Sequence, residues 1–265
     1  MDLEKLFLVL FFILGAVMGS FYHVVATRLS KNESIIFPGS HCQRCNHKLR
    51  WYENIPIISF LLLRGKCSSC GEDIPFSCLI VEIVTALLFA VSFHVFKFSF
   101  DLVIALIFVS SLIIVIVSDI EYMIILDEVL VVSTLSIIIF YIIYYLLIMD
   151  YKVGLKELMF NHVYPGIGAF VFMYALKIFG DKLFKKESLG GGDIKLMFLF
   201  GLVLGFPLAI CTIFLATFIA FPIAIIMLFV NKDNIIPFGP FLSMSGIIIL
   251  ISRIEFMDIL KFLIK

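Results

Sequence analysis

The sequence has few charged residues. Asp, Glu, Lys and Arg make up only 15% of its 265 residues, whereas 62% are hydrophobic, and a soluble domain carries about 25% charged residues. A chain of this length cannot bury so much apolar surface in water, so we expect a lipid bilayer to surround it. The 20 basic and 20 acidic residues cancel, and this balance gives no argument for a nucleic-acid partner.

The sequence also lacks a Gly/Ser-rich linker, a low-complexity tract and an internal repeat. Its first residues, Met1-Asp2-Leu3-Glu4-Lys5, lack the basic start of a secretory signal peptide, and the apolar stretch behind them continues to about Ala26. A signal peptide has a shorter apolar core that ends at a small-residue cleavage site. We therefore expect this stretch to be a retained transmembrane helix.

About eight segments are long and apolar enough to span a bilayer, which takes ~20 residues. They lie near residues 5–27, 76–96, 101–119, 125–148, 163–183, 194–209, 210–230 and 236–254. The sixth and seventh are divided near Pro207, because Gly201, Gly205 and Pro207 punctuate an apolar run that is too long for one helix. The sequence therefore predicts an all-α fold, a polytopic membrane bundle of about eight transmembrane helices.

The longest polar stretch, from Arg28 to Pro75, is basic. Its basic residues are Arg28, Lys31, Arg44, Lys48, Arg50, Arg64 and Lys66, and a later loop adds Lys182, Lys185 and Lys186. Both loops are expected on the cytoplasmic side, because short loops rich in Lys and Arg stay inside.

Four cysteines in this loop form two C-x-x-C pairs, Cys42 with Cys45 and Cys67 with Cys70. Two such pairs separated by a modest loop are typical of a tetrahedral zinc site, since each pair presents two thiolates from one tight turn. The reducing cytoplasm disfavours disulfides, and a redox C-x-x-C normally stands alone in a βαβ setting. Four thiolates leave no open coordination position, so this zinc would be structural.

His41 and His47 flank the first pair, and either is an alternative zinc ligand. The predicted organisation is a first transmembrane helix at residues 1–27, a cytoplasmic zinc-binding loop at 28–75, and a transmembrane bundle at 76–265.

Two aspartates stand at the ends of predicted spans, where charged side chains are costly and often functional. Asp119 closes an apolar run, and Asp193 follows Gly190, Gly191 and Gly192. Two spans lie between them, so both are expected on the same face. Two neighbouring carboxylates share a proton, as in aspartic proteases, where one activates water and the other polarises the scissile carbonyl. The glycines would let a substrate backbone approach closely.

Other interpretations of these acids remain open. Asp193 is also a plausible helix N-cap, and Asp119 a residue of the membrane interface. A proton- or metal-coupled transporter would use Asp119, Glu82 and Asp193 as a relay through broken helices. A membrane adaptor would use the cysteine loop to bind partners, but this leaves the glycine-aspartate segment unexplained.

Several segments together resemble the type IV prepilin peptidase family of GxGD aspartic proteases. The matching segments are Gly19-Ser20-Phe21, Cys42-Gln43-Arg44-Cys45, Trp51-Tyr52-Glu53-Asn54-Ile55-Pro56, Leu63-Arg64-Gly65-Lys66-Cys67, Ser118-Asp119-Ile120-Glu121 through Leu126-Asp127, Gly190-Gly191-Gly192-Asp193-Ile194-Lys195 and Ile236-Pro237-Phe238-Gly239-Pro240-Phe241. Three positions depart from the family pattern: His23 stands where Asn is common, Cys78-Leu79 replaces a Tyr-Pro pair, and Leu126 replaces a proline.

The resemblance implies an enzyme of the bacterial inner membrane with its active site facing the cytoplasm. Such enzymes cleave the leader of prepilins and pseudopilins, and many then methylate the new N-terminal residue with S-adenosylmethionine. Asp119 and Asp193 would be the catalytic pair. Glu53 is a candidate acid for methyl transfer, with Glu82 and Asp127 as auxiliary acids.

Overall fold

The structure is a computed structural model that describes residues 3–42, 44–148, 151–229 and 236–263. Within these residues the chain is helical and has no strand, apart from two isolated bridges, His41 with Lys48 and Lys66 with Asp73. The helices are α1 (Leu3–Ser30), η1 (Trp51–Asn54), α2 (Ile58–Leu62), α3 (Phe76–Phe96), α4 (Phe100–Tyr122), α5 (Asp127–Ile148), α6 (Tyr151–Leu158), η2 (Met159–Val163), α7 (Tyr164–Phe184), α8 (Gly191–Leu204), α9 (Phe206–Phe229), α10 (Gly239–Ser252) and α11 (Phe256–Leu263).

Six of the described helical segments are long and apolar enough to cross a membrane. They include α1, α3, α4, α5, α7 and most of α9, and the other two predicted spans correspond to the shorter helices α8 and α10. The all-α membrane fold is therefore confirmed, and the protein is a multi-pass membrane protein. The predicted end of the seventh span, residue 230, lies outside the described residues.

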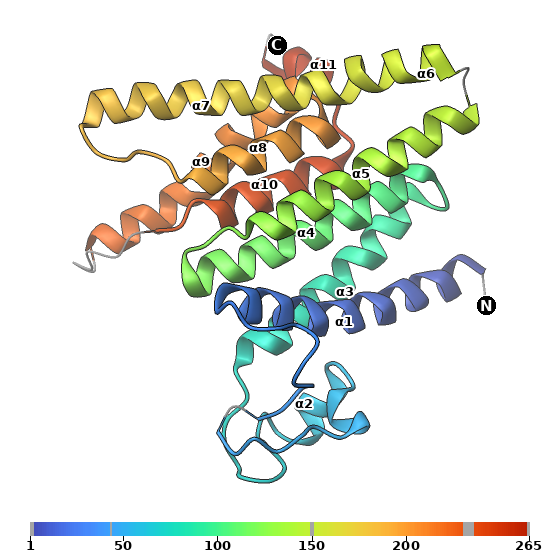
Figure 1. The fold of residues 1–265 in the computed structure, drawn as a ribbon, viewed down its shortest axis with the longest axis vertical. Helices are drawn as coiled ribbons and strands as arrows, with labels where there is room; N and C mark the ends of the chain where they lie inside the picture. The colour runs from blue at the N-terminus through green and yellow to red at the C-terminus, as the bar shows by residue number, and fades with distance from the viewer. Residues whose placement is uncertain (1–2, 43, 149–150, 230–235, 264–265) are drawn as a thin grey trace. The chain divides into compact units, whose positions relative to one another are not determined.

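The chain divides into two compact units, Met1–Leu102 and Val103–Lys265. In the first unit α1 packs on α3 through glycines (Figure 1). A Cβ on Gly15 would lie 2.7 Å from the Cα atom of Ala86, and one on Gly19 would lie 2.9 Å from that of Glu82. Small residues permit this close approach of two membrane helices. The predicted domain boundaries at residues 27 and 75 stay predictions.

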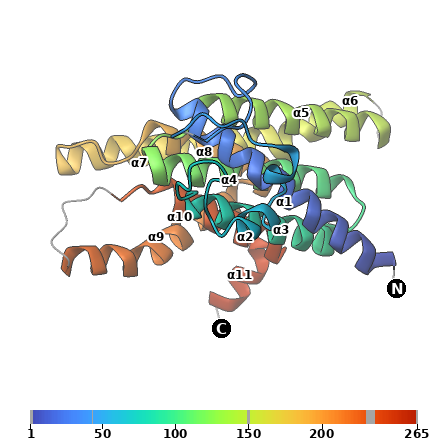
Figure 2. The ribbon, with the colours of Figure 1, turned by 90° about the horizontal axis from the view of Figure 1, so that it is seen from below.

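In the second unit α8 lies in contact with α5, α7, α9 and α10, and α7 runs beside it in both views (Figure 1, Figure 2). Its residues Leu196, Met197, Leu199, Phe200 and Leu202 are fully buried. The predicted break near Pro207 is confirmed: α8 ends at Leu204, and Gly205 takes the left-handed φ of 81° that separates it from α9. The short central helix begins at the glycine-aspartate segment.

Candidate active site and cysteine centre

Asp119 lies in the last turn of α4 and is only 6% exposed. The backbone N–H of Gly239, the first residue of α10, donates a hydrogen bond to its carboxylate. The two residues are so close that a Cβ on Gly239 would collide with Oδ2 of Asp119. Glycine is therefore the residue that lets the α10 backbone reach this carboxylate.

Asp193 is the third residue of α8 and is also 6% exposed. The helix N-cap is Gly190, whose backbone N–H donates to the Asp193 carboxylate. Asp193 therefore supports the helix start from the third position, as an acid does in a capping box, and is not itself the N-cap. Its other oxygen, Oδ1, is buried and has no hydrogen-bond partner among the described residues.

The two carboxylates interact electrostatically with each other. Ile125, in the link between α4 and α5, connects their surroundings: a Cβ on Gly192 would lie 2.6 Å from Cβ of Ile125, and one on Gly239 would lie 3.1 Å from its Cδ1. The structure thus brings Asp119, Asp193 and the glycines beside them around one apolar side chain. Two interacting acids that are both buried can hold a single proton between them.

Asp127 lies nearby in sequence but is differently placed. Both of its carboxylate oxygens accept hydrogen bonds from Nζ of Lys195, at 2.7 and 2.6 Å, and both side chains are exposed. This ion pair joins the first turn of α5 to Lys195, the fifth residue of α8. Asp127 therefore faces a cation at the surface, whereas Asp119 and Asp193 are buried.

The four predicted zinc cysteines form a second cluster, in the first unit. All four Sγ atoms lie within 4.8 Å of one another, with Cys42 and Cys70 3.8 Å apart and Cys45 and Cys67 4.0 Å apart. A tetrahedral zinc ion at ~2.3 Å from each sulfur requires sulfurs ~3.8 Å apart, whereas a disulfide requires ~2.05 Å. The arrangement fits a metal ion and does not fit disulfides.

Backbone hydrogen bonds shape the two cysteine turns in the same way. The N–H of Cys42 donates to the carbonyl of His47 at 3.0 Å, and the N–H of Cys67 donates to that of Glu72 at 2.8 Å. Gly71 closes the second turn with a φ of 73°. Because the backbone holds each turn, the thiolates are positioned for a metal without help from the flanking histidines.

Glu53 and Glu82 are buried and bind the loop that contains the cysteines. Glu53 accepts the backbone N–H of Arg50 at 2.7 Å and lies 3.4 Å from Nε2 of His47. The Arg50 hydrogen bond holds the pKa of Glu53 below its usual value. Glu82, on α3, accepts the N–H of Ile57 at 2.7 Å, where the backbone has a φ of 64°. Both acids belong to the first unit, and Asp119 and Asp193 belong to the second.

Some site residues had no assigned role in the sequence. Gly239 stands in the matched segment near the C-terminus, but nothing in its residue type points to Asp119. Ile125 is one apolar residue among many and gives no signal. Two departures from the family pattern meet in the structure, because Sγ of Cys78 lies 3.6 Å from the ring nitrogens of His23.

Two family profiles match the chain. One, described as the Bacterial Peptidase A24 N-terminal domain, covers residues 13–96. The other, described as the Type IV leader peptidase family, covers residues 106–225. The first contains the cysteine centre, and the second contains Asp119 and Asp193.

Named relatives agree with these profiles. The prepilin leader peptidase/N-methyltransferase of Bacillus subtilis is 32% identical over 89% of this chain and 91% of the relative. The protein of that name from Vibrio cholerae is 30% identical over 94% of this chain and 98% of its own. The one from Myxococcus xanthus is 33% identical over 74% of this chain, which spans 56% of that relative. No solved structure matches. On these matches, which run through both units, the chain belongs to the type IV leader peptidase family.

Proposed function

We propose that this protein cleaves the leader peptide of prepilins or pseudopilins and then methylates the new N-terminal amine. The relatives above carry both activities in their names, and none of them is a transporter. The observation that supports proteolysis is the pair of buried, interacting carboxylates of Asp119 and Asp193. A membrane adaptor would not need such a pair.

The two carboxylates provide the groups that peptide hydrolysis needs. One keeps the shared proton and donates a hydrogen bond to the scissile carbonyl, and the other accepts a proton from the attacking water. The hydroxide oxygen bonds to the carbonyl carbon, and the C–N bond then breaks as the leaving amine takes up a proton. Oδ1 of Asp193, which is buried without a hydrogen-bond partner in the described part of the chain, is the oxygen available for this exchange.

The bilayer determines where the substrate meets this pair. Asp119 stands at the end of an apolar helix of 23 residues, so its carboxylate lies where a span meets water. A prepilin is expected to present its cleavage point at the same depth. By the positive-inside rule this face is the cytoplasmic side of the bacterial inner membrane.

The cysteine centre would hold structural zinc. The thiolates of Cys42, Cys45, Cys67 and Cys70 would bind the ion, and it would fix the fold of the loop without an open position for substrate. Methylation would use S-adenosylmethionine, which supplies an electrophilic methyl group. Glu53 and Glu82 accept backbone hydrogen bonds from the loop, so we propose that they stabilise its fold. Asp127 pairs with Lys195, so we propose that it stabilises the position of α8.

The deciding experiment is leader cleavage of a purified prepilin by detergent-solubilised Asp119→Asn and Asp193→Asn variants. Asparagine keeps the shape of the side chain but cannot share a proton, so both variants should lose cleavage. Asp127→Asn is the matched control, because it removes an exposed acid at the start of α5, the helix that follows Asp119. This variant should remain active. Normal processing by either of the first two variants would refute the assignment.

A further inference from the structure

The stretch between the two cysteine turns carries large apolar side chains that are exposed. It comprises residues 51–62, which include η1 and α2, and we call it the apolar segment. Trp51 is 80% exposed and Leu62 is 78% exposed, and Ile58 and Leu61 are exposed as well. Exposed apolar residues that cluster in this way mark a surface that something else covers. The contacts of the segment within the first unit indicate what covers it.

Ile57, the N-cap of α2, is fastened to the side of α3. Its N–H donates to the buried carboxylate of Glu82 at 2.7 Å. With 21 residues, α3 is about 32 Å long at ~1.5 Å per residue, which is close to the ~30 Å of a bilayer's hydrocarbon core. Phe76, its first residue, therefore stands near the membrane boundary, and Glu82 lies about 9 Å inside it. The start of α2 lies at the depth of Glu82, below the boundary.

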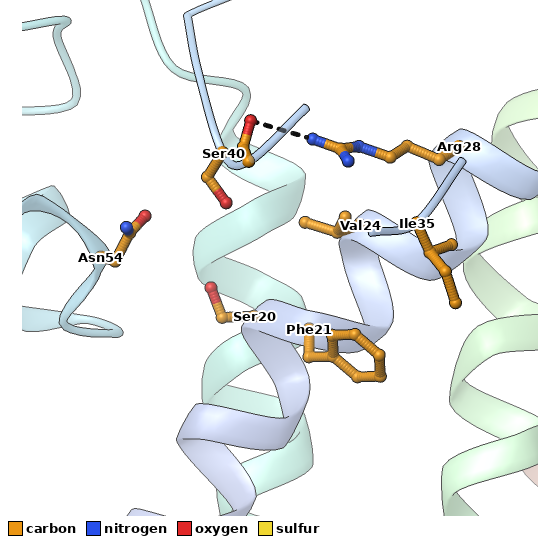
Figure 3. Close-up of a pocket in the computed structure, with 8 residues that line it drawn as sticks. Ser20, Phe21, Val24, Arg28, Ile35, Ser40 and Asn54 are labelled. Carbon is orange, nitrogen blue, oxygen red and sulfur yellow. Dashed lines mark hydrogen bonds between the residues drawn. The ribbon is translucent and has the colours of Figure 1, made fainter. Parts of the chain in front are cut away.

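A cavity of about 240 Å³ places η1 close to the same boundary. Ser20 and Val24 of α1 and Asn54 of η1 are among the residues that line it. Figure 3 shows Asn54 across from this part of α1, with Arg28 further along the helix. Arg28 stands about 12 Å beyond Ser20, and basic residues near the end of a span lie at the level of the headgroups. η1 is thus beside the span and not beyond its end. In Figure 1, α2 likewise lies alongside α1, between the two ends of that helix.

The backbone of Ile57 has a conformation that needs a cause. Its φ of 64° lies in the left-handed region, which β-branched residues rarely adopt. The turn at this residue brings α2 against α3, where the rings of Phe60 and Phe76 meet with their centroids 6.1 Å apart. An N–H group in the apolar layer of a membrane must have an acceptor within the protein, and Glu82 supplies it. A position of α2 in the lipid layer therefore explains both the strained turn and the buried acid.

The side chains of the apolar segment suit the interface between lipid and water. Three exposed residues of α2 recur at the i, i+3 and i+4 spacing of one helix face: Ile58, Leu61 and Leu62. Trp51 and Tyr52 form an aromatic pair with ring centroids 5.7 Å apart, and the exposed side chains of Arg50 and Arg64 flank the segment. Trp and Tyr are enriched at the level of the headgroups, and Arg is attracted to anionic lipids. An apolar face with basic edges is typical of a helix that lies in the membrane surface.

We infer that the apolar segment inserts into the lipid leaflet on the side of the membrane where the cysteine turns lie. The apolar face of α2 contacts acyl chains, and Trp51 lies at the level of the headgroups. Lipid is the partner at hand, because it already covers the exposed apolar residues of the adjoining span α3. The insertion fixes the two cysteine turns, which precede and follow the segment in the sequence, to the membrane surface. This inference does not depend on the proposed function.

The test uses the fluorescence of Trp51, the only tryptophan in the chain. The full-length protein is placed in nanodiscs of phosphatidylcholine and phosphatidylglycerol, either plain or brominated on the acyl chains, because bromine quenches tryptophan on contact. Brominated lipid should remove most of the Trp51 emission, whereas iodide in the water should remove little of it.

Two variants measure depth on a Trp51→Phe background. Leu62→Trp places the probe on the apolar face of α2, and bromine deeper in the acyl chains should quench it. Glu33→Trp is the matched control, since Glu33 is exposed and lies beyond the end of α1. Iodide should quench this probe and brominated lipid should not. Thermal unfolding in detergent reports whether each variant is folded.

The outcomes distinguish lipid from other partners. If iodide quenches Trp51 and brominated lipid does not, the segment faces water and the inference is wrong. If bromine reaches Trp51 but not the probe of the Leu62→Trp variant, α2 stays outside the acyl layer and the depth assigned from Glu82 is wrong. If Trp51 becomes shielded from iodide only when a prepilin is added, the segment docks that protein and not lipid. If it becomes shielded only in nanodiscs that hold two copies of the chain, the partner is the second copy, and the inference is again overturned.

Discussion

Replacing Gly239 with alanine tests the geometry of Asp119 with a single methyl group. The new Cβ would collide with Oδ2 of Asp119, lie 3.3 Å from its Cγ and lie 3.1 Å from Cδ1 of Ile125. Gly239 is not among the glycines with positive φ, so its backbone conformation suits alanine. Any effect must therefore come from the contact with the carboxylate.

The size of the effect follows from how far the carboxylate must move. Cβ atoms in proteins keep ~3 Å or more from other heavy atoms, so the carboxylate or the start of α10 has to shift by roughly 1 Å. A misplacement of that size costs on the order of 100-fold in rate, or about 2.7 kcal/mol of transition-state stabilisation. We expect kcat/KM for leader cleavage to fall by this factor in Gly239→Ala.

The assay is steady-state cleavage of a purified prepilin, with thermal unfolding in detergent as a second measurement. Gly246→Ala is the matched control on the same helix, because its Cβ would lie 2.8 Å from the ring of Phe200 and would not touch Asp119. Overpacking costs about 1–3 kcal/mol of stability at such sites, so both variants should unfold earlier, but only Gly239→Ala should lose activity. Wild-type kcat/KM in Gly239→Ala would refute the reasoning.

Three further predictions concern the neighbouring segments. Gly191→Ala should keep leader cleavage and Gly192→Ala should lose it. Among the described residues, a Cβ at residue 191 meets no atom within 4 Å, whereas one at residue 192 lies 2.6 Å from Cβ of Ile125. Equal activity of the two variants in a cleavage assay would contradict this. Lys195→Met should lower stability by less than about 1 kcal/mol in thermal unfolding, since its ion pair with Asp127 is exposed, and a larger loss would show that the pair does more than join two turns. Cys67→Ser should abolish bound zinc, measured by elemental analysis, and speed proteolysis of residues 31–75; full metal content would contradict a four-cysteine site.

The sequence was sufficient to predict the membrane helices, because a bilayer imposes both length and apolarity on each span. The break before Pro207 was predictable from glycine and proline alone. The clustering of the four cysteines was also predictable, since two C-x-x-C turns separated by a modest loop are typical of a metal site. The number of spans is harder to predict, because α8 and α10 have only 14 residues each, fewer than the ~20 that a straight span takes.

The contacts of Asp119 could not be predicted in the same way. Gly239 lies 120 positions further along the chain, and the hydrogen bond it donates comes from the backbone, which every residue except proline has. The carboxylates of Glu53 and Glu82 also accept hydrogen bonds from backbone N–H groups. The residue type shows which side chains can donate or accept hydrogen bonds. It does not show which backbone N–H group will meet a given carboxylate, because that depends on the fold.

The kind of partner given to each acid distinguishes catalysis from support. Asp127 accepts hydrogen bonds from the ammonium of Lys195, and both side chains are exposed. Asp119 and Asp193 receive N–H groups from Gly239 and Gly190 instead. A neutral donor orients a carboxylate without supplying a full opposite charge, so the buried pair can still share a proton. Glycine thus has two functions here: it lets the backbone come close to each acid, and it supplies a neutral backbone donor.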